Sequence, residues 1–527
     1  MGDSRQILKR IDQMKTRRAL VENAWRACFN YTYPLRGVGF NSLNTPIEFG
    51  LASANAKQAE LYDTTATNSV RLLASTLLGG MTPANSQWVG ADVFDATDDE
   101  KAWLQEAAHL VWLNIHASNY TGHAFECFMD SVIAGQFALF VDEGKEEPFR
   151  FEQWPLSQCY FACSQPGGRV DIIAREFQLS AQQAFNAYGD KVCKQIVEAL
   201  DKNPDKLFPF IQLVEPRPNP KQLELPISST HICMTSKEVV RDSGYKAHPV
   251  VVPRLLCLPG SAYAQGLVYD ALPTIKSLNK LTEIMLGTGD MAMAGMWGAV
   301  DDGILNPKTV TIGPRRIITM ASRDSMFPLS PGSNFQIGQW MIENMQAQVR
   351  KALLSDDLIN KNGNSYMTAT EVNARVSAVR QMLGPNYERF QDEFLRPLFF
   401  RCFTICWEKG IFKDPPPSLA NKIMRVTYST PLAKAQKAED VQAMVSYESL
   451  LAQEAQVKPE VLDLYDWDMA ARLKADMTGI NVRLMKNSKI VAQEREQRAK
   501  AQQEALKQQQ IAEAAKQGDE AMEAFSG

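Results

Sequence analysis

Three histidines recur at intervals of seven residues, at His109, His116 and His123. Histidine is a common zinc ligand, so this spacing raises the question of a metal site. On a helix, seven residues rise by about 10 Å, whereas one ion holds each ligand at about 2 Å. Gly122 also disfavours one unbroken helix through all three. We therefore favour structural roles for these histidines and expect no metal site.

An acidic run, Asp98-Asp99-Glu100, has two interpretations. Carboxylates are the oxygen ligands that divalent cations prefer. Acidic residues are also favourable at the amino-terminal end of a helix, where the backbone dipole is positive. We favour a helix that begins near Lys101, with these acids at its start.

The commonest catalytic signatures are absent. No segment has the phosphate-binding form Gly-x-x-x-x-Gly-Lys-Ser/Thr, and the glycines at Gly79-Gly80 and Gly287 to Gly289 lack the lysine. His-Glu-x-x-His and Gly-x-Ser-x-Gly do not occur either. Nine cysteines are scattered without the two-residue spacing of zinc or redox motifs. We expect no catalytic residue, no cofactor and no enzymatic activity, so any ATP-driven step would come from a partner.

The composition is that of a soluble globular protein. The 527 residues are 45% hydrophobic and 22% charged, which is enough chain for roughly three or four compact units. A net charge of -4 gives no general attraction to a polyanion, so tight binding to nucleic acid is not expected. No apolar run is long enough to span a membrane, and the amino terminus lacks an export signal, so we expect assembly in a cytoplasm.

Apolar periodicity predicts helices in the first half of the chain. One helix is predicted from Ile7 to Phe29, and a second from about Ala54 to the Gly79-Gly80 pair, whose glycines would stop it. Trp88 to Phe94 is predicted as a strand. Residues 207–260 contain short β-rich runs between prolines and predict hairpins, with strands at 231–235, 238–241 and 250–252.

Two further helices are predicted to flank a small insert. The first begins at Pro273, where proline is tolerated in the first turn, and runs to Leu286; the second covers Ile337 to Leu354. Between them, glycine and proline surround the β-like runs 309–312 and 316–320. Such a paired stalk cannot bury both faces itself, so contacts between neighbouring copies in a ring would cover them.

The chain after the second helix alternates between loop and helix. Residues 355–365 are polar and favour turns, and Thr368 with Glu371 has the spacing of a capping box that starts a new helix. This helix is predicted to reach Leu383, and another to cover 386–408. Beyond Pro431 the composition is helical. Residues 481–517 contain neither glycine nor proline and would form a helix about 55 Å long, which either packs against copies of itself or frays.

Four stretches, in this order and spacing, resemble the portal, or head-to-tail connector, proteins of short-tailed bacteriophages. They are Arg71 to Pro83 followed by Trp88, Val132 to Val141, Tyr263 to Gly266 continuing to Ala271–Leu281, and Met367 to Val372 continuing to Leu383-Gly384-Pro385 and Leu395-Arg396-Pro397. The similarity covers roughly residues 60 to 420.

The resemblance implies a mostly helical α+β portal fold. Its parts would be a wing (1–262), a first stem helix (263–294), a small α/β clip (295–334), a second stem helix (335–354), a channel loop (355–367), a wing or tunnel helix (368–430) and a helical crown with a C-terminal tail (431–527). Twelve copies would assemble as a ring.

Three groups of residues are candidates for function, each with a plain alternative. The resemblance places Asn360, Lys361, Asn362 and Asn364 at the channel wall, where they would contact DNA phosphates without sequence specificity; they could also form an ordinary solvated loop. Arg315 and Arg316 in the clip could bind the packaging motor or a tail adaptor, or guard an exposed strand edge. Trp340, Met341 and Met345 could contact a neighbouring subunit or belong to an ordinary core, which is slightly favoured.

The function implied by the resemblance is a portal ring at one capsid vertex. It would be the conduit for packaging and ejection of double-stranded DNA and would bind the terminase packaging motor, tail adaptors, and capsid and scaffolding proteins, with no membrane partner. Its location would be the virion, after assembly in the host cytoplasm. The alternatives are a tail or collar ring that does not take part in packaging, and a nucleic-acid enzyme, which the missing motifs disfavour.

Overall fold

The computed structural model describes residues 4–40, 47–218, 224–294, 296–300, 322, 324, 326–329, 335–356, 384–419, 422–428, 431–456, 458–478, 491 and 493–503. The chain forms two compact units. The first contains residues 1–88 and 110–411, and the second contains residues 89–109 and 412–527. Segments far apart in the sequence therefore build the second unit.

The first unit begins with a group of helices. The 29-residue helix α1 buries Ile11, Met14, Trp25 and Phe29 on one side, which matches its predicted periodicity. A 3₁₀ segment, Pro34–Phe40, follows it. The helices of this part are α1 (Ser4–Thr32), α2 (Ile47–Ala59), α3 (Thr65–Met81) and α5 (Tyr120–Ala134).

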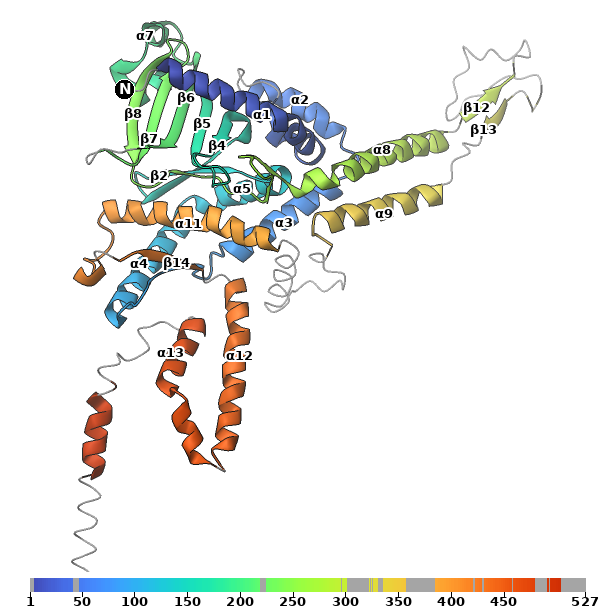
Figure 1. Cartoon of the computed structure of the whole chain (residues 1–527). Coiled ribbons are helices and arrows are strands. Elements are labelled where there is room, and N and C mark those ends of the chain that lie inside the picture. Colours follow the sequence, from blue (N-terminus) through green and yellow to red (C-terminus); the bar gives the residue numbers. More distant parts are fainter. Residues whose placement is uncertain are drawn as a thin grey trace, which may run out of the picture. The chain divides into compact units, whose positions relative to one another are not determined.

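The first unit contains a five-stranded antiparallel sheet, which lies beside α1 (Figure 1). Its strands, in spatial order, are β4 (Cys159–Ala162), β5 (Ile172–Ser180), β6 (Leu207–Pro216), β7 (Ile227–Cys233) and β8 (Glu238–Tyr245). Helix α1 packs on one face through Ile11 and Met14. Helices α6 (Ala181–Tyr188) and α7 (Lys194–Lys202) cover part of the other face around Phe208 and Phe210. The rest of that face carries polar side chains.

A second, three-stranded sheet has the order β3-β2-β9, from β2 (Ala138–Glu143), β3 (Phe149–Trp154) and β9 (Val250–Val251). The loop between α5 and β2 carries Phe137, whose ring packs edge-on against Phe394 of α11 (Pro385–Glu408), with ring centres 5.4 Å apart. Phe128 and Phe390 complete this aromatic core. Long-range aromatic packing thus joins α11 to α5 and the small sheet.

Two long helices and a hairpin complete the first unit. Helix α8 (Leu267–Ala294) follows a small ribbon of β10 (Leu256–Cys257) and β11 (Ala264–Gln265). Strands β12 (Met296–Ala299) and β13 (Met326–Leu329) pair with each other, and α9 (Phe335–Ala352) returns beside α8. The chain therefore leaves along one helix and comes back along the other (Figure 1).

The second unit is built from a ribbon and helices. Strand β1 (Val89–Val93) pairs with β14 (Met424–Tyr428), and α4 (Asp98–Ala117) has its first part, to His109, in this unit. Helices α12 (Pro431–Glu454) and α13 (Trp467–Thr478) pack on each other, and residues 493–503 are helical. No helix of the described part of the chain is long and apolar enough to cross a membrane.

Most predicted elements are present, and a mostly helical α+β class is confirmed. Three details were wrong. Helix α8 starts at Leu267, so Pro273 lies inside it. Because proline has no backbone N–H, the carbonyl of Tyr269 lacks its helical hydrogen bond; Tyr269 is an exposed residue. The single helix predicted from Ala54 is two helices, broken at 60–64. Helix α3 continues through Gly79-Gly80 to Met81, because helical backbone is compatible with both glycines. The predicted β-like runs 309–312 and 316–320 and the Thr368/Glu371 capping box lie outside the described residues.

Candidate functional site

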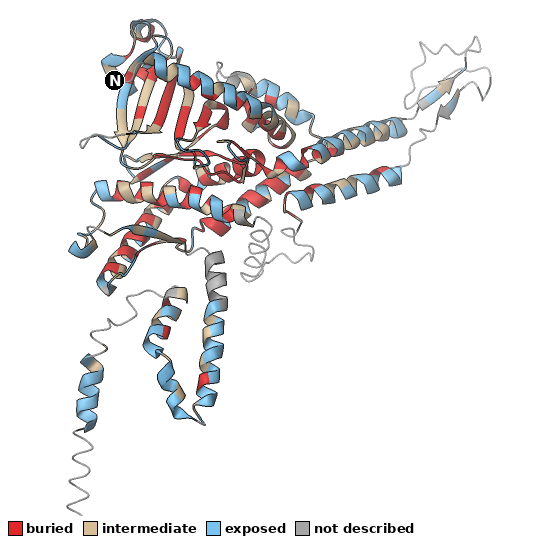
Figure 2. Ribbon diagram, viewed as in Figure 1, coloured by how far each residue is buried: buried red, intermediate tan, exposed pale blue. Residues whose placement is uncertain are grey.

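Helices α8 and α9 form a stalk whose base is packed and whose outer part is not. The first turns of α8 bury Val268, Ala271, Ile275 and Leu278. From Asn279 to Met293, no side chain of α8 is buried. In α9, Val349 is buried near the base, and Gly338 is buried in the outer part. Figure 2 shows this change from buried to exposed along both helices. The two helices support each other over their outer part without help from the globular body.

The junction at the base is held by hydrogen bonds to one turn. The Asn279 side chain accepts from the backbone N–H of Tyr62 (2.8 Å) and donates to the carbonyl of Glu60 (3.0 Å). Gln346 of α9 donates to Asp63 at 2.8 Å. Both stalk helices are therefore fixed to residues 60–63, between α2 and α3. Sequence reasoning missed these contacts because isolated polar residues give no signal of partners more than 200 positions away.

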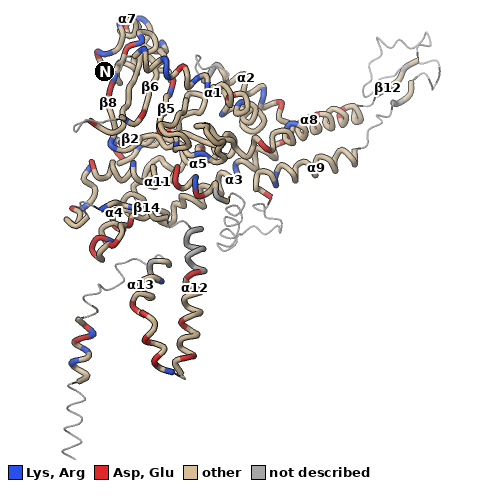
Figure 3. The backbone as a smooth tube through the Cα atoms, in the orientation of Figure 1, with Lys and Arg blue, Asp and Glu red and all other residues tan. Residues whose placement is uncertain are grey.

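The outer stalk exposes an unusual set of large apolar side chains. Few charges interrupt them: Figure 3 shows mainly uncharged residues along α8 and α9. The exposed apolar residues of the outer stalk and its hairpin are Ile284, Leu286, Met291, Met293, Trp297, Val300, Phe327, Phe335, Ile337, Trp340 and Met341. A soluble protein seldom leaves such a concentration of apolar surface in water, so we interpret this surface as one that a partner covers.

The predicted stem residues can be placed on this surface. Trp340 is 64% exposed and Met341 is 37% exposed, while Met345 is half-buried. The ordinary-core interpretation is therefore wrong for Trp340, because its own chain does not enclose the indole. The contact with a neighbouring subunit stays a prediction. The other predicted residues, Arg315, Arg316, Asn360, Lys361, Asn362 and Asn364, lie outside the described residues.

Comparison with known proteins identifies the family. The family model described as "Bacteriophage head to tail connecting protein" matches residues 4–485. The chain belongs to this family. The family that the sequence resemblance implied is therefore confirmed.

Similar proteins come from several bacteriophages. This connecting-protein chain is 26% identical over 521 residues to the "Probable portal protein" of Bordetella phage BPP-1, which covers 95% of this chain and 92% of the relative. It is 24% identical over 549 residues to the "Portal protein" of Salmonella phage epsilon15 (98% and 94%). It is 20% identical over 351 residues to the "Portal protein" of Enterobacteria phage T3 (64% and 62%).

The histidines and the acidic run have structural surroundings in this connecting protein. The indole N–H of Trp88 donates to Nε2 of His116 at 3.1 Å, and the His116 ring packs edge-on against Trp112 and Tyr120. Burial lowers the pKa of His116, which favours the neutral ring that accepts this bond. Within the described ranges, no three His, Cys, Asp or Glu side chains gather in a way that could hold a metal ion.

Glu100 confirms the helix-start interpretation of the acidic run. Its carboxylate accepts from the backbone N–H of Thr97 at 2.8 Å, while the Thr97 hydroxyl accepts from the backbone N–H of Glu100 at 3.4 Å. This reciprocal pair is a capping box at the start of α4. The buried carboxylate also pairs with Lys422 at 2.8 Å, and this hydrogen bond is the largest cause that lowers the pKa of Glu100 to about 2.

Proposed function

We propose that this protein is a bacteriophage portal subunit. Copies of the chain form a ring at one vertex of the capsid, and double-stranded DNA passes through the ring during packaging and ejection. The ring docks the packaging motor first and the tail afterwards. Membership of the head-to-tail connecting family supports this function, as do full-length relatives that are named portal proteins.

One structural observation carries the proposal: the outer stalk leaves its apolar side chains in water. Each kilocalorie of hydrophobic free energy requires only about 40 Å² of apolar surface at ~25 cal/mol per Å², so several large side chains give a strong drive for association. A neighbour that uses a different patch to cover this stalk exposes its own stalk to the next copy. Repeated contacts of this kind close into a ring when the rotation between copies allows it.

The finer assignments belong to the same proposal. The ring is a dodecamer with a wing, a two-helix stem, a clip at the hairpin end, a channel loop and a helical crown. Arg315 and Arg316 contact the terminase motor or a tail adaptor. Asn360, Lys361, Asn362 and Asn364 meet DNA phosphates. Capsid and scaffolding proteins contact the outside of the ring, which assembles in the host cytoplasm and stays in the virion.

A tail or collar ring without a part in packaging is less well supported. Two relatives that match more than nine tenths of this chain are named "Probable portal protein" and "Portal protein". Catalysis is not part of the proposal, because the sequence lacks nucleotide-binding signatures. An ATPase or nuclease assay on the pure protein tests that exclusion.

The central test is the assembly state of the purified full chain. Negative-stain images should show rings with a central hole, and mass photometry should give about twelve copies. Trp340→Glu should abolish or strongly weaken ring formation, because a carboxylate would be buried at the contact. Leu20→Glu is a matched control: Leu20 is 84% exposed on α1, outside the stalk, so this variant should form rings. A folded wild-type chain that stays monomeric at micromolar concentration overturns the proposal.

A further inference from the structure

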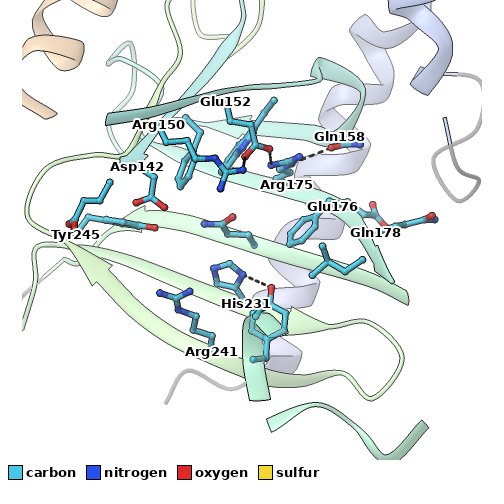
Figure 4. A pocket seen from close by; sticks show the side chains of 18 of the residues that line it. Asp142, Arg150, Glu152, Gln158, Arg175, Glu176, Gln178, His231, Arg241 and Tyr245 are labelled. Carbon is cyan, nitrogen blue, oxygen red and sulfur yellow. Dashed lines mark hydrogen bonds and ion pairs between the residues drawn. The ribbon is translucent and has the colours of Figure 1, made fainter. Parts of the chain in front are cut away.

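A second feature of the first unit is a cleft between its two sheets. It has a volume of about 1180 Å³ and lies between the uncovered face of the five-stranded sheet and strands β2 and β3. Figure 4 shows the side chains that converge on it. The end of α11 contributes Arg401 and Glu408 to its lining. No residue of the two stalk helices lines this cleft.

The floor of the cleft is a row of nitrogen-bearing side chains, one on each of four successive strands. The register aligns Arg175 with Gln212, Gln212 with His231, and His231 with Arg241. Because neighbouring strands lie about 4.8 Å apart, the row extends over roughly 14 Å. Arg175, Gln212 and His231 already form hydrogen bonds within the protein, so among the described residues of this row Arg241 is the donor that a ligand with acceptor oxygens would meet.

A β-bulge brings Arg241 into this row. The pairing of β7 with β8 shifts between His231 and Ile232, so Val240 has no partner on β7. Val240 is buried in the core under α6 and α7, and Arg241 lines the cleft beside it. Bulges commonly redirect a side chain at functional sites.

The centre of the row is neutral and fixed. The His231 Nδ1 lies 3.0 Å from the Tyr188 hydroxyl, and the Gln212 amide donates to the Ser229 hydroxyl at 3.2 Å. Burial, together with the charge of Arg241, lowers the pKa of His231 to about 4, so its imidazole is neutral at pH 7. The positive charge of the floor therefore comes from its two arginines.

Most carboxylates around the cleft are paired with cations, whereas Arg241 is not paired with a carboxylate. Arg175 pairs with Glu152 at 2.7 Å. Three other carboxylates of the lining have cation partners: Asp142 pairs with Arg401 at 3.7 Å, Glu408 with Lys246 at 3.0 Å, and Glu176 with Lys15 of α1 at 2.8 Å. Glu143, at the exposed end of β2, has no cation partner among the described residues. In the same part of the chain, Arg241 has no carboxylate within ion-pair distance; the adjacent Asp242 lies 3.9 Å from Arg217.

We propose that this cleft binds an acidic polypeptide segment of a partner protein, with a carboxylate of the segment paired to Arg241. An unpaired guanidinium is well suited to a carboxylate, which it can bind through two parallel hydrogen bonds. The site is too large for a single small anion. The opposite wall offers the half-buried ring of Phe140 for apolar contact; this ring stacks on the buried Trp154, with ring centres 4.8 Å apart.

The neighbouring strand edge favours a polypeptide as the occupant. Among the described strands, β8 is the last of the sheet and pairs with β7 alone. Its outer backbone groups can therefore pair with an extended chain that lies along the cleft. Such a segment would combine main-chain pairing on β8 with a carboxylate on Arg241. The site lies apart from the stalk, so binding of a peptide to it can be measured whether or not the protein forms rings.

The test uses a fluorescently labelled hexaglutamate peptide and the full-length protein at about 0.15 M salt. Fluorescence anisotropy should show saturable binding to the wild-type chain. Arg241→Glu should weaken binding about tenfold or more, because loss of a charged hydrogen bond changes affinity by about this factor. Arg241→Gln should weaken binding less, because its amide still donates a hydrogen bond. Lys237→Glu is the matched control, with the same charge change at the exposed β7–β8 turn, and should bind as the wild type does.

Four results would overturn the proposal. The first is the absence of saturable hexaglutamate binding. The second is an equal loss in Arg241→Glu and Lys237→Glu, which would show only diffuse attraction between charges. The third is equal competition by an oligonucleotide of the same charge, which would show a site for polyanions in general. The fourth is failure of a folded Arg241→Glu chain to form rings, which would assign the cleft to a neighbouring copy.

Discussion

Gly338 of α9 lies directly against Met285 of α8: a Cβ atom added to Gly338 would be 2.3 Å from the Met285 sulfur. The glycine lets the two stalk helices approach closely in the region that the globular body does not support. The Met285 thioether can move aside for a methyl group, but a larger side chain would push the helices apart.

Gly338→Leu should therefore lower the free energy of unfolding by about 1–3 kcal/mol, the usual cost of overpacking. It should also reduce the yield of rings. Gly287→Leu is the matched control, because a Cβ at Gly287 meets no atom within 4 Å. That exchange should be neutral or stabilise the helix by up to about 1 kcal/mol. Urea denaturation of both variants measures the difference, and equal effects would contradict the close-contact argument.

A second prediction concerns the buried ion pair between Arg254 and Glu393. The Glu393 carboxylate accepts from Arg254 Nε at 3.1 Å and Nη2 at 2.5 Å, and from the Arg254 backbone N–H at 3.0 Å. Both side chains are buried. Glu393→Ala should lower the free energy of unfolding by about 3–5 kcal/mol, because the guanidinium would be left buried without its partner.

The same helix supplies the control for this pair. Asp392, next to Glu393, pairs with Arg396 at 3.1 Å, and both side chains are more than half exposed. Asp392→Ala should cost at most about 1 kcal/mol, since water screens an exposed pair. Comparable losses in the two variants, measured by urea denaturation, would be evidence against a buried role for Glu393.

This pair also marks the limit of what the sequence could predict. Apolar periodicity was sufficient to predict α1, α9 and α11, whose bounds match the expected helices closely. The buried face of an amphipathic helix is visible in the local sequence as apolar residues at helical spacing. Arg254 and Glu393 are 139 positions apart, and no local pattern shows that they meet. Pairing of this kind depends on the tertiary fold.

The early start of α8 and the assembly of the cleft both depend on tertiary contacts that local sequence patterns do not show. Pro273 is usually interpreted as a first-turn residue, but tertiary packing of Val268 and Ala271 stabilises nearly two turns of helix before it. The floor of the cleft is assembled from strands between Arg175 and Arg241, and only the register of those strands brings the four side chains into one row. The stalk candidates were predictable because both helices are continuous in sequence.

A third prediction uses the lowered pKa of Glu100. The ordinary value is 4.5, and the value in the folded protein is about 2. A carboxyl group whose pKa is lowered by folding stabilises the fold fully above its ordinary pKa, and this contribution is lost as the pH falls toward the folded value. The destabilisation caused by Glu100→Gln should therefore be largest near pH 7 and should shrink between about pH 4.5 and pH 2. Urea midpoints at several pH values measure it, with the exposed Asp99→Asn as a control; a difference that does not vary with pH would refute the assignment.

The proposed DNA contact of Lys361 gives a fourth prediction. Lys361→Ala should leave rings intact and weaken their binding to DNA of any sequence. The dependence of log affinity on log salt should become shallower by about 0.9 for each phosphate that the variant ring no longer neutralises. Lys280→Ala, an exposed lysine on α8 paired with Glu283, is the control and should change neither quantity. Unchanged DNA binding in Lys361→Ala rings would show that Lys361 does not contact DNA phosphates.

The last prediction concerns the C-terminal tail, residues 481–527. The described helical part, 493–503, is almost fully exposed, and the ion pair of Arg495 with Asp468 is exposed on both sides. An exposed pair contributes little to stability, so the tail adds little to the fold of α12 and α13.

A chain that ends at residue 480 should form rings as the full chain does, while DNA packaging or the attachment of internal proteins changes. A shorter truncation, after residue 503, separates the role of the exposed helical part from that of residues 504–527. Purified truncated protein that stays monomeric would show instead that the tail drives assembly.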